Sequence, residues 1–287
     1  MRLWISNFLR SPAVLMLIGG TGTLVLFIVV VMLLWRTGGA KLVSDNAALI
    51  GAMVTLGGVF TAQMVSIALD DRRSQEARDL EKQRAQDDAS QAYLDQMSLL
   101  LLDKDRPLRQ SIEGDEVRTL ARARTLTVLP RLDGAEKANV VQFLYESDLI
   151  TKDTFLVDLH QSDLRKAGLS GANLRNSILS RAYLTSANLN EADLSEADLR
   201  GAYLRGADLR GAKPIGADLG GAYLKGANLS DANLREAQSW TEEQLRSAYS
   251  LQGAIMPDGQ VLKSDDNPDG PTFEDWLKGC GKAGDNE

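Results

Sequence analysis

Residues 187–211 read ANLNEADLSEADLRGAYLRGADLRG, with a leucine at every fifth position. The same spacing runs from Val157 to Ala237, where sixteen pentads contain fifteen leucines and one interruption at Pro214. A small residue, usually alanine, lies two positions before each leucine. This period fits neither a helix nor a strand, and it is typical of a solenoid in which each unit buries its face against the next. A bundle of helices is the alternative.

The Ala-(Asp/Asn)-Leu-x-x units resemble those of the pentapeptide-repeat family. That resemblance implies a right-handed, four-sided β-helix of about four coils. The tyrosines give independent support for four sides, because Tyr183, Tyr203 and Tyr223 are spaced by twenty residues, or four pentads. Their rings should therefore stack on one face of successive coils, at a spacing of roughly 4.8 Å.

Two uncharged runs, residues 13–35 and 47–69, precede the repeats. Each is long enough to cross a bilayer, so the sequence predicts two transmembrane helices. The excess of Lys and Arg outside the loop that joins them predicts a multi-pass protein of the bacterial inner membrane with both termini cytoplasmic. A cleaved signal peptide is the alternative for the first run, and a buried soluble helix for the second.

The expected fold class is therefore a membrane-anchored α part followed by an all-β solenoid. From Asp70 a charged linker helix leads to an adaptor of short helices that caps the repeats, and Thr241 with Gln244 predicts a capping box in a C-terminal cap helix. The linker could also form a coiled coil. The expected segments are a cytoplasmic N-terminus at 1–12, transmembrane helices at 13–35 and 47–69, the linker at 70–105, the adaptor at 106–153, the β-helix at 154–238, the cap at 239–262 and a disordered tail at 263–287.

The most distinctive surface of the expected rod is its tyrosine wall. Aromatic rings beside cations are frequent hot spots of protein interfaces, so we expect this wall to bind a partner protein, although ring packing that only stabilises the coils is the alternative. The tyrosine wall consists of Tyr183, Tyr203 and Tyr223, with Arg165, Arg205 and Lys225 one residue after the central leucines.

Composition argues against catalysis and against nucleic-acid binding. The net charge is -7, His160 is the only histidine and Cys280 the only cysteine, so we expect no catalytic residues, metal site or cofactor. The predicted function is a non-enzymatic, membrane-tethered scaffold, bound to the bilayer through two spans and to an unknown protein through its solenoid. The sequence leaves an oligomer open.

Two other functions remain open at this point. Some relatives in the pentapeptide-repeat family resemble duplex DNA in charge and interact with a topoisomerase, and the arginines scattered through this tract weaken that interpretation. The second alternative is that the chain is an accessory subunit of a membrane channel or transporter. The sequence identifies no partner or process, and it does not show whether the break at Pro214 or the basic face of the adaptor has a function.

Overall fold

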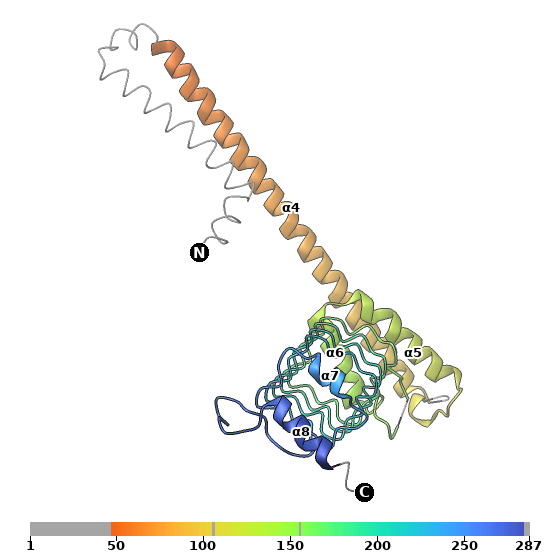
Figure 1. The fold of residues 1–287 in the computed structure, drawn as a ribbon. Coiled ribbons are helices and arrows are strands. Elements are labelled where there is room, and N and C mark those ends of the chain that lie inside the picture. Colours follow the sequence, from red (N-terminus) through yellow and green to blue (C-terminus); the bar gives the residue numbers. More distant parts are fainter. Residues whose placement is uncertain (1–46, 105–106, 155, 284–287) are drawn as a thin grey trace. The chain divides into compact units, whose positions relative to one another are not determined.

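The computed structural model describes residues 47–104, 107–154 and 156–283. The chain divides into two compact units, Met1–Lys82 and Gln83–Glu287. The described part of the first unit is the beginning of a single helix, α4, which spans Ala47–Leu102 (Figure 1). The helix contains no proline, and an exposed ion pair between Arg72 and Glu76 at 3.0 Å supports its charged middle.

The structure corrects the predicted membrane topology. The first predicted span, 13–35, and the N-terminal segment 1–12 lie outside the described residues. No helix within the described ranges combines the length and the hydropathy that a bilayer crossing requires. The expected transmembrane helix at 47–69 is therefore wrong, and so is the multi-pass localisation built on it.

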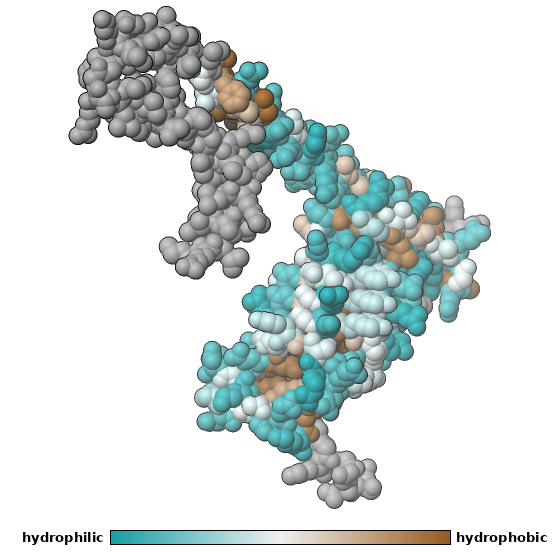
Figure 2. All heavy atoms as spheres, turned by 45° about the horizontal axis from the view of Figure 1, so that its top comes forward, coloured by the Kyte–Doolittle hydropathy of each residue, from teal (hydrophilic) through white to brown (hydrophobic). Residues whose placement is uncertain are grey.

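The physical reason lies in the composition of α4. Its first part exposes Val59 and Phe60, and Figure 2 shows apolar atoms there and mostly hydrophilic atoms farther along. Thr61, whose hydroxyl donates to the carbonyl oxygens of Gly57 and Gly58, belongs to a set of polar and glycine residues that lowers the hydropathy of this stretch.

The adaptor, expected at 106–153, consists of short helices that belong to the second unit. The end of α4 packs against α5 (Glu116–Val128) and α6 (Gly134–Glu146), with 3-10 turns η1 at Leu108–Gln110 and η2 at Leu129–Arg131. The hydroxyls of Tyr93 and Thr125 form a buried hydrogen bond of 2.8 Å between α4 and α5. Their shared core continues without interruption into that of the repeats.

The repeats form stacked coils with a period of twenty residues. Each pentad contributes one residue to a parallel bridge with the pentad twenty residues away, as in the pairs Tyr183–Tyr203 and Tyr203–Tyr223. We call each stack of such pentads a wall, and the tyrosine wall begins with Asp163. The bridge positions of the second wall are Gly168, Asn188, Asp208, Asn228 and Ser250. Those of the third wall are Asn173, Asp193, Lys213, Asn233 and Ile255. Those of the fourth wall are Ile178, Asp198, Asp218 and Gln238.

The expected all-β class is wrong for the described residues, since they contain isolated bridges and no strand. The reason is the length of the unit. Two of every five residues form a turn, which makes a corner of the coil. The second residue of each turn has a positive φ, between 53° and 66° from Arg181 to Gly221. A single paired residue between two corners is too short for a strand ladder. The membrane-anchored part of the expected class is wrong for the reason given above.

The core of the coils is built from the two inward positions of each pentad. The central leucines and the alanines two residues earlier are almost all buried, as Leu204 and Ala202 illustrate with exposures of 1% and 0%. Burial of a leucine side chain contributes roughly 2 kcal/mol, so the repeated Leu/Ala layers supply most of the cohesion between coils. The remaining three positions of each pentad face outward, and many of them are exposed.

Pro214 keeps the register of the repeat. It is buried in the position of the central leucine, and Ile215 stays half-exposed rather than turning inward. The amide of Lys213 still donates to Ala192 O at 2.9 Å, and that of Asn233 to Ala212 O at 2.8 Å. The interruption therefore costs one donor, because proline has no N–H, and it produces no bulge.

The C-terminal end is closed by two helices. The predicted capping box is present in α7, Glu242–Arg246, between Thr241 and Gln244. The tail, expected to be disordered, contains α8, Phe273–Ala283. Trp276 is 2% exposed and donates its ring N–H to the Asp258 carboxylate at 2.9 Å, which attaches the tail to the last coil.

Candidate protein-binding surface

The three tyrosines of the tyrosine wall form one continuous stack. The ring centroids of Tyr183 and Tyr203 are 4.9 Å apart, and those of Tyr203 and Tyr223 are 4.8 Å apart, with interplanar angles of 13° and 3°. The twenty-residue spacing predicted this stack, and the structure confirms it. Tyr183 is 40% exposed and Tyr223 56%, so the outer edges and hydroxyls remain accessible.

The three cations of the tyrosine wall do not have the same environment. Arg165 is held by Asp163, with Nε to Oδ1 at 2.9 Å and Nη2 to Oδ2 at 2.5 Å. This hydrogen bonding from Arg165 holds the pKa of the Asp163 carboxyl at about 2, below its ordinary value of 3.8. Arg205 and Lys225 are exposed and make no side-chain ion pair with the described residues. Two of the three predicted cations are thus available to a partner.

Both ends of the tyrosine wall are sealed by helices. At the first coil, the buried ammonium of Lys137 donates to Asp163 Oδ1 at 3.2 Å and to Arg165 O at 3.0 Å. At the last coil, the amide of Gln244 donates to Leu219 O and Ala222 O at 2.8 and 2.9 Å. The accessible part of the wall is therefore the stretch that carries the tyrosines.

Asp163 is the residue that the sequence analysis missed on this wall. It lies twenty residues before Tyr183 and is bridged to it, so the register alone identifies its position. Thr185 takes the place of a cation one coil before Arg205. The aromatic and cationic surface is therefore concentrated around Tyr203 and Tyr223.

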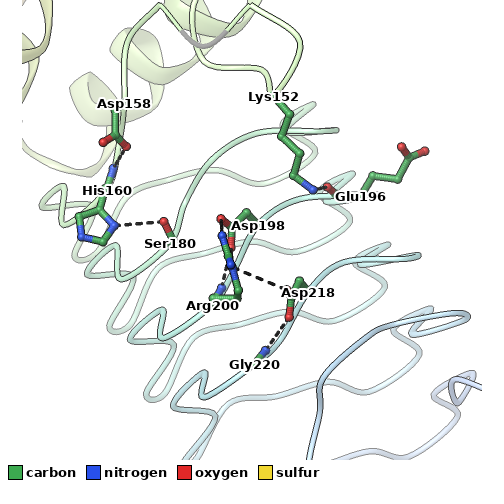
Figure 3. A network of polar contacts seen from close by, with 9 residues as sticks. All are labelled: Lys152, Asp158, His160, Ser180, Glu196, Asp198, Arg200, Asp218 and Gly220. Atoms are coloured by element: carbon green, nitrogen blue, oxygen red, sulfur yellow. Dashed lines mark hydrogen bonds and ion pairs between the residues drawn. The ribbon is translucent and has the colours of Figure 1, made fainter. Parts of the chain in front are cut away.

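The fourth wall carries a polar network of a different kind (Figure 3). Arg200 pairs with Asp198 through Nε and Nη2 at 2.9 and 2.7 Å, and its Nε also lies 3.6 Å from Asp218 Oδ2. Asp218 in turn accepts from the amide of Gly220 at 3.0 Å. These acids are occupied by neighbours on their own wall, so the network is a structural one.

His160 belongs to the same surface at the first coil. Its amide donates to Asp158 Oδ1 at 2.6 Å, and its ring Nδ1 lies 3.1 Å from Ser180 Oγ. Arg122 of α5 adds an ion pair with Asp158 at 3.5 Å and a hydrogen bond to His160 O at 3.3 Å. The arginine that contributed to the predicted basic face thus joins the adaptor to the coils.

The acids of the walls are neutralised in a recurring pattern. An aspartate at the bridge position is paired with an arginine two residues later, as in Asp208 and Arg210 at 2.7 Å. The hydrogen bond from Arg210 lowers the pKa of Asp208. The same spacing produces the pairs Asp163–Arg165 and Asp198–Arg200. A surface of paired charges differs from the unpaired acids that a mimic of duplex DNA needs.

No group of three or more potential ligands that could hold a metal ion occurs among the described residues. The aspartates named above are engaged by local partners, whereas Arg205 and Lys225 are exposed and make no ion pair with the described residues. Such an arrangement is suited to contact with another macromolecule, because a reaction needs several groups that converge in a concave site.

Comparison with known proteins agrees with the repeat pattern. The family described as pentapeptide repeats matches this chain in eight copies, over residues 157–181, 177–213 and 215–238. No curated protein matches the chain.

Several solved structures of pentapeptide-repeat proteins are similar. Rfr23 of the cyanobacterium Cyanothece 51142 is 38% identical, with 37% of this chain and 61% of that one covered and a TM-score of 0.27. QnrB1, a plasmid-mediated fluoroquinolone resistance protein, is 22% identical over 38% of this chain and 62% of its own, with a TM-score of 0.28. This chain thus spans about three fifths of the length of these two proteins.

HetL of Nostoc sp. strain PCC 7120, a pentapeptide-repeat protein involved in heterocyst differentiation regulation, is 33% identical. The match covers 37% of this chain and 68% of HetL, with a TM-score of 0.17. The similarity carries over neither the biological process of HetL nor a partner. With its eight matched repeat copies, this chain belongs to the pentapeptide-repeat family.

Proposed function

We propose that the chain is a non-enzymatic scaffold that binds a partner protein through its tyrosine wall. The observation that carries this proposal is the exposed stack of Tyr183, Tyr203 and Tyr223 beside two unpaired cations. Stacked tyrosines are rigid and amphipathic, so they lose little conformational entropy when they contact another protein. Tyrosine and arginine are also enriched among the residues that dominate binding energy.

The charges around the stack favour an acidic partner surface. Arg205 and Lys225 lie one residue after the leucines that follow Tyr203 and Tyr223, and neither forms an ion pair with an acid among the described residues. Asp163, the acid at the beginning of the wall, is occupied by Lys137 and Arg165. The partner that fits best therefore places carboxylates beside an apolar or aromatic contact.

The topoisomerase-interacting alternative has less support. It depends on a surface that resembles the phosphates of duplex DNA, and three aspartates at bridge positions, Asp163, Asp198 and Asp208, are paired with arginines. The matched QnrB1 structure is below one quarter identical, so its name is evidence for the fold and not for a shared target.

The test is affinity purification with the full chain and two double variants. The variant Tyr203→Ala/Tyr223→Ala removes the centre of the stack. The matched control Asn188→Ala/Asn228→Ala changes the same bridge position on the neighbouring second wall. We expect a partner that copurifies with the wild-type chain and the control and is depleted at least tenfold with the tyrosine variant.

Equal recovery with both double variants would refute the role of the tyrosine wall. Circular dichroism and thermal unfolding of each variant identify a loss of recovery that comes from unfolding. A partner lost only with the control variant would move the binding surface to the second wall.

A further inference from the structure

The first coil of a solenoid has no preceding coil, so its backbone groups need other partners. On the third wall every later bridge residue donates its amide to an alanine carbonyl of the preceding coil. Asp193 donates to Ala172 O at 2.9 Å, Lys213 to Ala192 O at 2.9 Å and Asn233 to Ala212 O at 2.8 Å. Asn173 is the first bridge residue of this wall.

The adaptor supplies partners at the first coil of the other walls. Gly134 of α6 accepts from the Gly168 amide at 2.8 Å, and Ile150 accepts from the Ile178 amide at 3.2 Å. The tyrosine wall receives the ammonium of Lys137, which donates to Asp163 Oδ1 and to Arg165 O.

The third wall has no backbone partner of this kind. Neither the amide nor the carbonyl of Asn173 has a backbone hydrogen-bond partner among the described residues, and the same holds for Asp163, whose edge Lys137 covers. Its side chain is exposed, where Oδ1 accepts from the local amide of Arg175 at 3.2 Å and the side chain also hydrogen-bonds with Tyr145 of α6. An unpaired edge of this kind is a template on which an extended chain can add.

The core is also incompletely covered at this point. The small inward residues of the other walls in the same coil, Ser162, Ala167 and Ser177, are 0% exposed. Ala172 is only partly buried. Because the neighbouring coils present the same small side chain fully buried, the exposure of Ala172 marks a missing layer.

A cavity of about 350 Å³ occupies this place, between the second half of α6 and the first coil. That volume is at the lower end of the range of ligand-binding cavities. The only charged side chain in its lining is Glu146, which accepts from the Gln142 amide at 2.8 Å. The part of the lining that matters here is Ala138, Val141 and Tyr145 on α6, with Gly168, Ala172 and Asn173 on the coil.

We propose that this cavity is a docking site for an extended, uncharged peptide segment of a partner protein, which adds one rung to the third wall at Asn173. The segment accepts a hydrogen bond from the Asn173 amide through one carbonyl and donates an N–H to the Asn173 carbonyl. It places a small side chain, such as alanine, over Ala172.

The later coils specify this occupant. On the third wall, Asp193 donates its amide to Ala172 O of the preceding coil, and its carbonyl accepts from Leu174 N of that coil at 2.7 Å. If Asn173 bonds in the same way, the added segment must place a carbonyl where Ala172 O lies relative to Asp193, and an N–H where Leu174 N lies. The one charged side chain of the lining, Glu146, is engaged by Gln142, and the other lining residues are uncharged. The cavity therefore disfavours a charged residue, because burial of an unpaired charge is costly.

The proposal concerns a surface separate from the tyrosine wall, and it is tested with a separate probe. The probe is the peptide acetyl-Gly-Ala-Asn-Leu-Ser-amide, which has the sequence of residues 226–230 and carries no charge. It is titrated into the full chain labelled with ¹⁵N-asparagine, and the Asn173 signal is assigned by its absence in Asn173→Asp. We expect a saturable shift of that signal with a dissociation constant of about 1 mM or below.

Two controls make the outcome decisive. A peptide methylated on the leucine nitrogen lacks the donor for the Asn173 carbonyl, and we expect it to bind at least fivefold more weakly. The variant Ala138→Trp fills the cavity, whereas Asn139→Trp places the same ring on an exposed position of α6 outside the lining. Ala138→Trp should abolish the shift and Asn139→Trp should preserve it.

No shift of Asn173 at several millimolar peptide, or an equal shift with the methylated peptide, would overturn the proposal. An equal response of the two tryptophan variants would overturn it as well. Neither result changes the expectation for Tyr203→Ala/Tyr223→Ala, so this proposal can fail while the proposed function stands.

Discussion

The rings of Tyr203 and Tyr223 lie 4.8 Å apart and within 3° of parallel, which is the spacing of one coil of the solenoid. Because Tyr203 also stacks on Tyr183, it is the only tyrosine of the wall with a ring on both sides. The coil repeat thus imposes a face-to-face geometry that aromatic pairs adopt less readily on their own. The stack is a consequence of register and offers a preformed contact surface.

The first prediction concerns the stability of this stack. Tyr203→Ala removes two ring contacts and Tyr183→Ala removes one, and each contact contributes about 0.5–1.5 kcal/mol beyond burial. We expect Tyr203→Ala to lower the free energy of unfolding by about twice as much as Tyr183→Ala, with both variants still folded. Urea unfolding measures the difference, and equal losses would show that the contacts contribute little.

The second prediction concerns acid sensitivity. The hydrogen bonds from Arg165 and the charge of Lys137 hold the pKa of Asp163 at about 2 in the folded chain, against an ordinary value of 3.8. The unfolded chain therefore binds more protons in this range, and stability present above pH 3.8 is lost as pH falls toward 2. In Arg165→Ala the pKa of Asp163 should rise toward its ordinary value and part of this loss should disappear.

Carboxyl titration by NMR and urea unfolding between pH 2 and about 5 measure both quantities. Lys225→Ala is the matched control, since it removes a cation of the same wall that has no ion pair with the described residues. An Asp163 pKa that is unchanged in Arg165→Ala would contradict the assignment of Arg165 as the main cause.

The third prediction concerns the corners of the coils. Ser186 and Gly206 occupy equivalent corners on successive coils, with φ of 57° and 63°. A Cβ at Gly206 would meet only Ser186 Oγ, at 3.8 Å, so steric clash does not enter. Gly206→Ala should therefore cost about 1 kcal/mol through its left-handed backbone alone.

The reciprocal change serves as its control. Ser186→Gly relieves the same strain, and we expect it to be neutral or to raise the melting temperature, because the entropy of the added glycine offsets part of the gain. A lower melting temperature for Ser186→Gly than for Gly206→Ala would contradict this explanation.

The fourth prediction concerns the C-terminal tail. Trp276 packs beside Trp240 and Phe273 and donates to Asp258. Trp276→Ala should detach α8 and cost about 3 kcal/mol or more, whereas Trp276→Phe should lose only the hydrogen bond, about 1 kcal/mol. Trypsin cleavage at Lys263 is the readout, and it should accelerate strongly in Trp276→Ala. Unchanged cleavage would show that α8 does not protect this segment.

Patterns with a fixed period were the most informative part of the sequence. The leucine repeat located the inward positions, the spacing of Tyr183, Tyr203 and Tyr223 predicted the stack, and Thr241 with Gln244 predicted the capping box. These features depend on residues close in sequence or on one repeated distance. Such information is fully contained in the order of the residues.

Features that depend on single tertiary contacts were not predictable in this way. Trp276 holds a tail whose composition is otherwise rich in Asp, Asn, Gly and Pro, and an average over the segment hides one anchoring side chain. The burial of Lys137 follows from the docking of α6 on the first coil. The span at 47–69 was predicted from an uncharged run, and no helix among the described residues has the length and hydropathy that a crossing requires.

The candidate site was predicted in its composition but not in its electrostatics. Arg165 was expected to contribute a free cation, and it is taken up by Asp163 two residues earlier. Both side chains point outward from the same pentad, so the spacing of Asp and Arg already contains this pair. The same pair recurs at Asp198 and Asp208, where an arginine again follows two residues later.

The most direct test of the central claim is site-specific photo-crosslinking in the full chain. A benzoylphenylalanine replaces Tyr223 in one protein and Asn228, at the equivalent position of the neighbouring wall, in the other. If the tyrosine wall binds the partner, the crosslink forms at position 223, is at least tenfold weaker at position 228 and is lost when Tyr203→Ala and Arg205→Ala are added. Equal crosslinking at both positions, or crosslinking that survives those substitutions, would contradict the account.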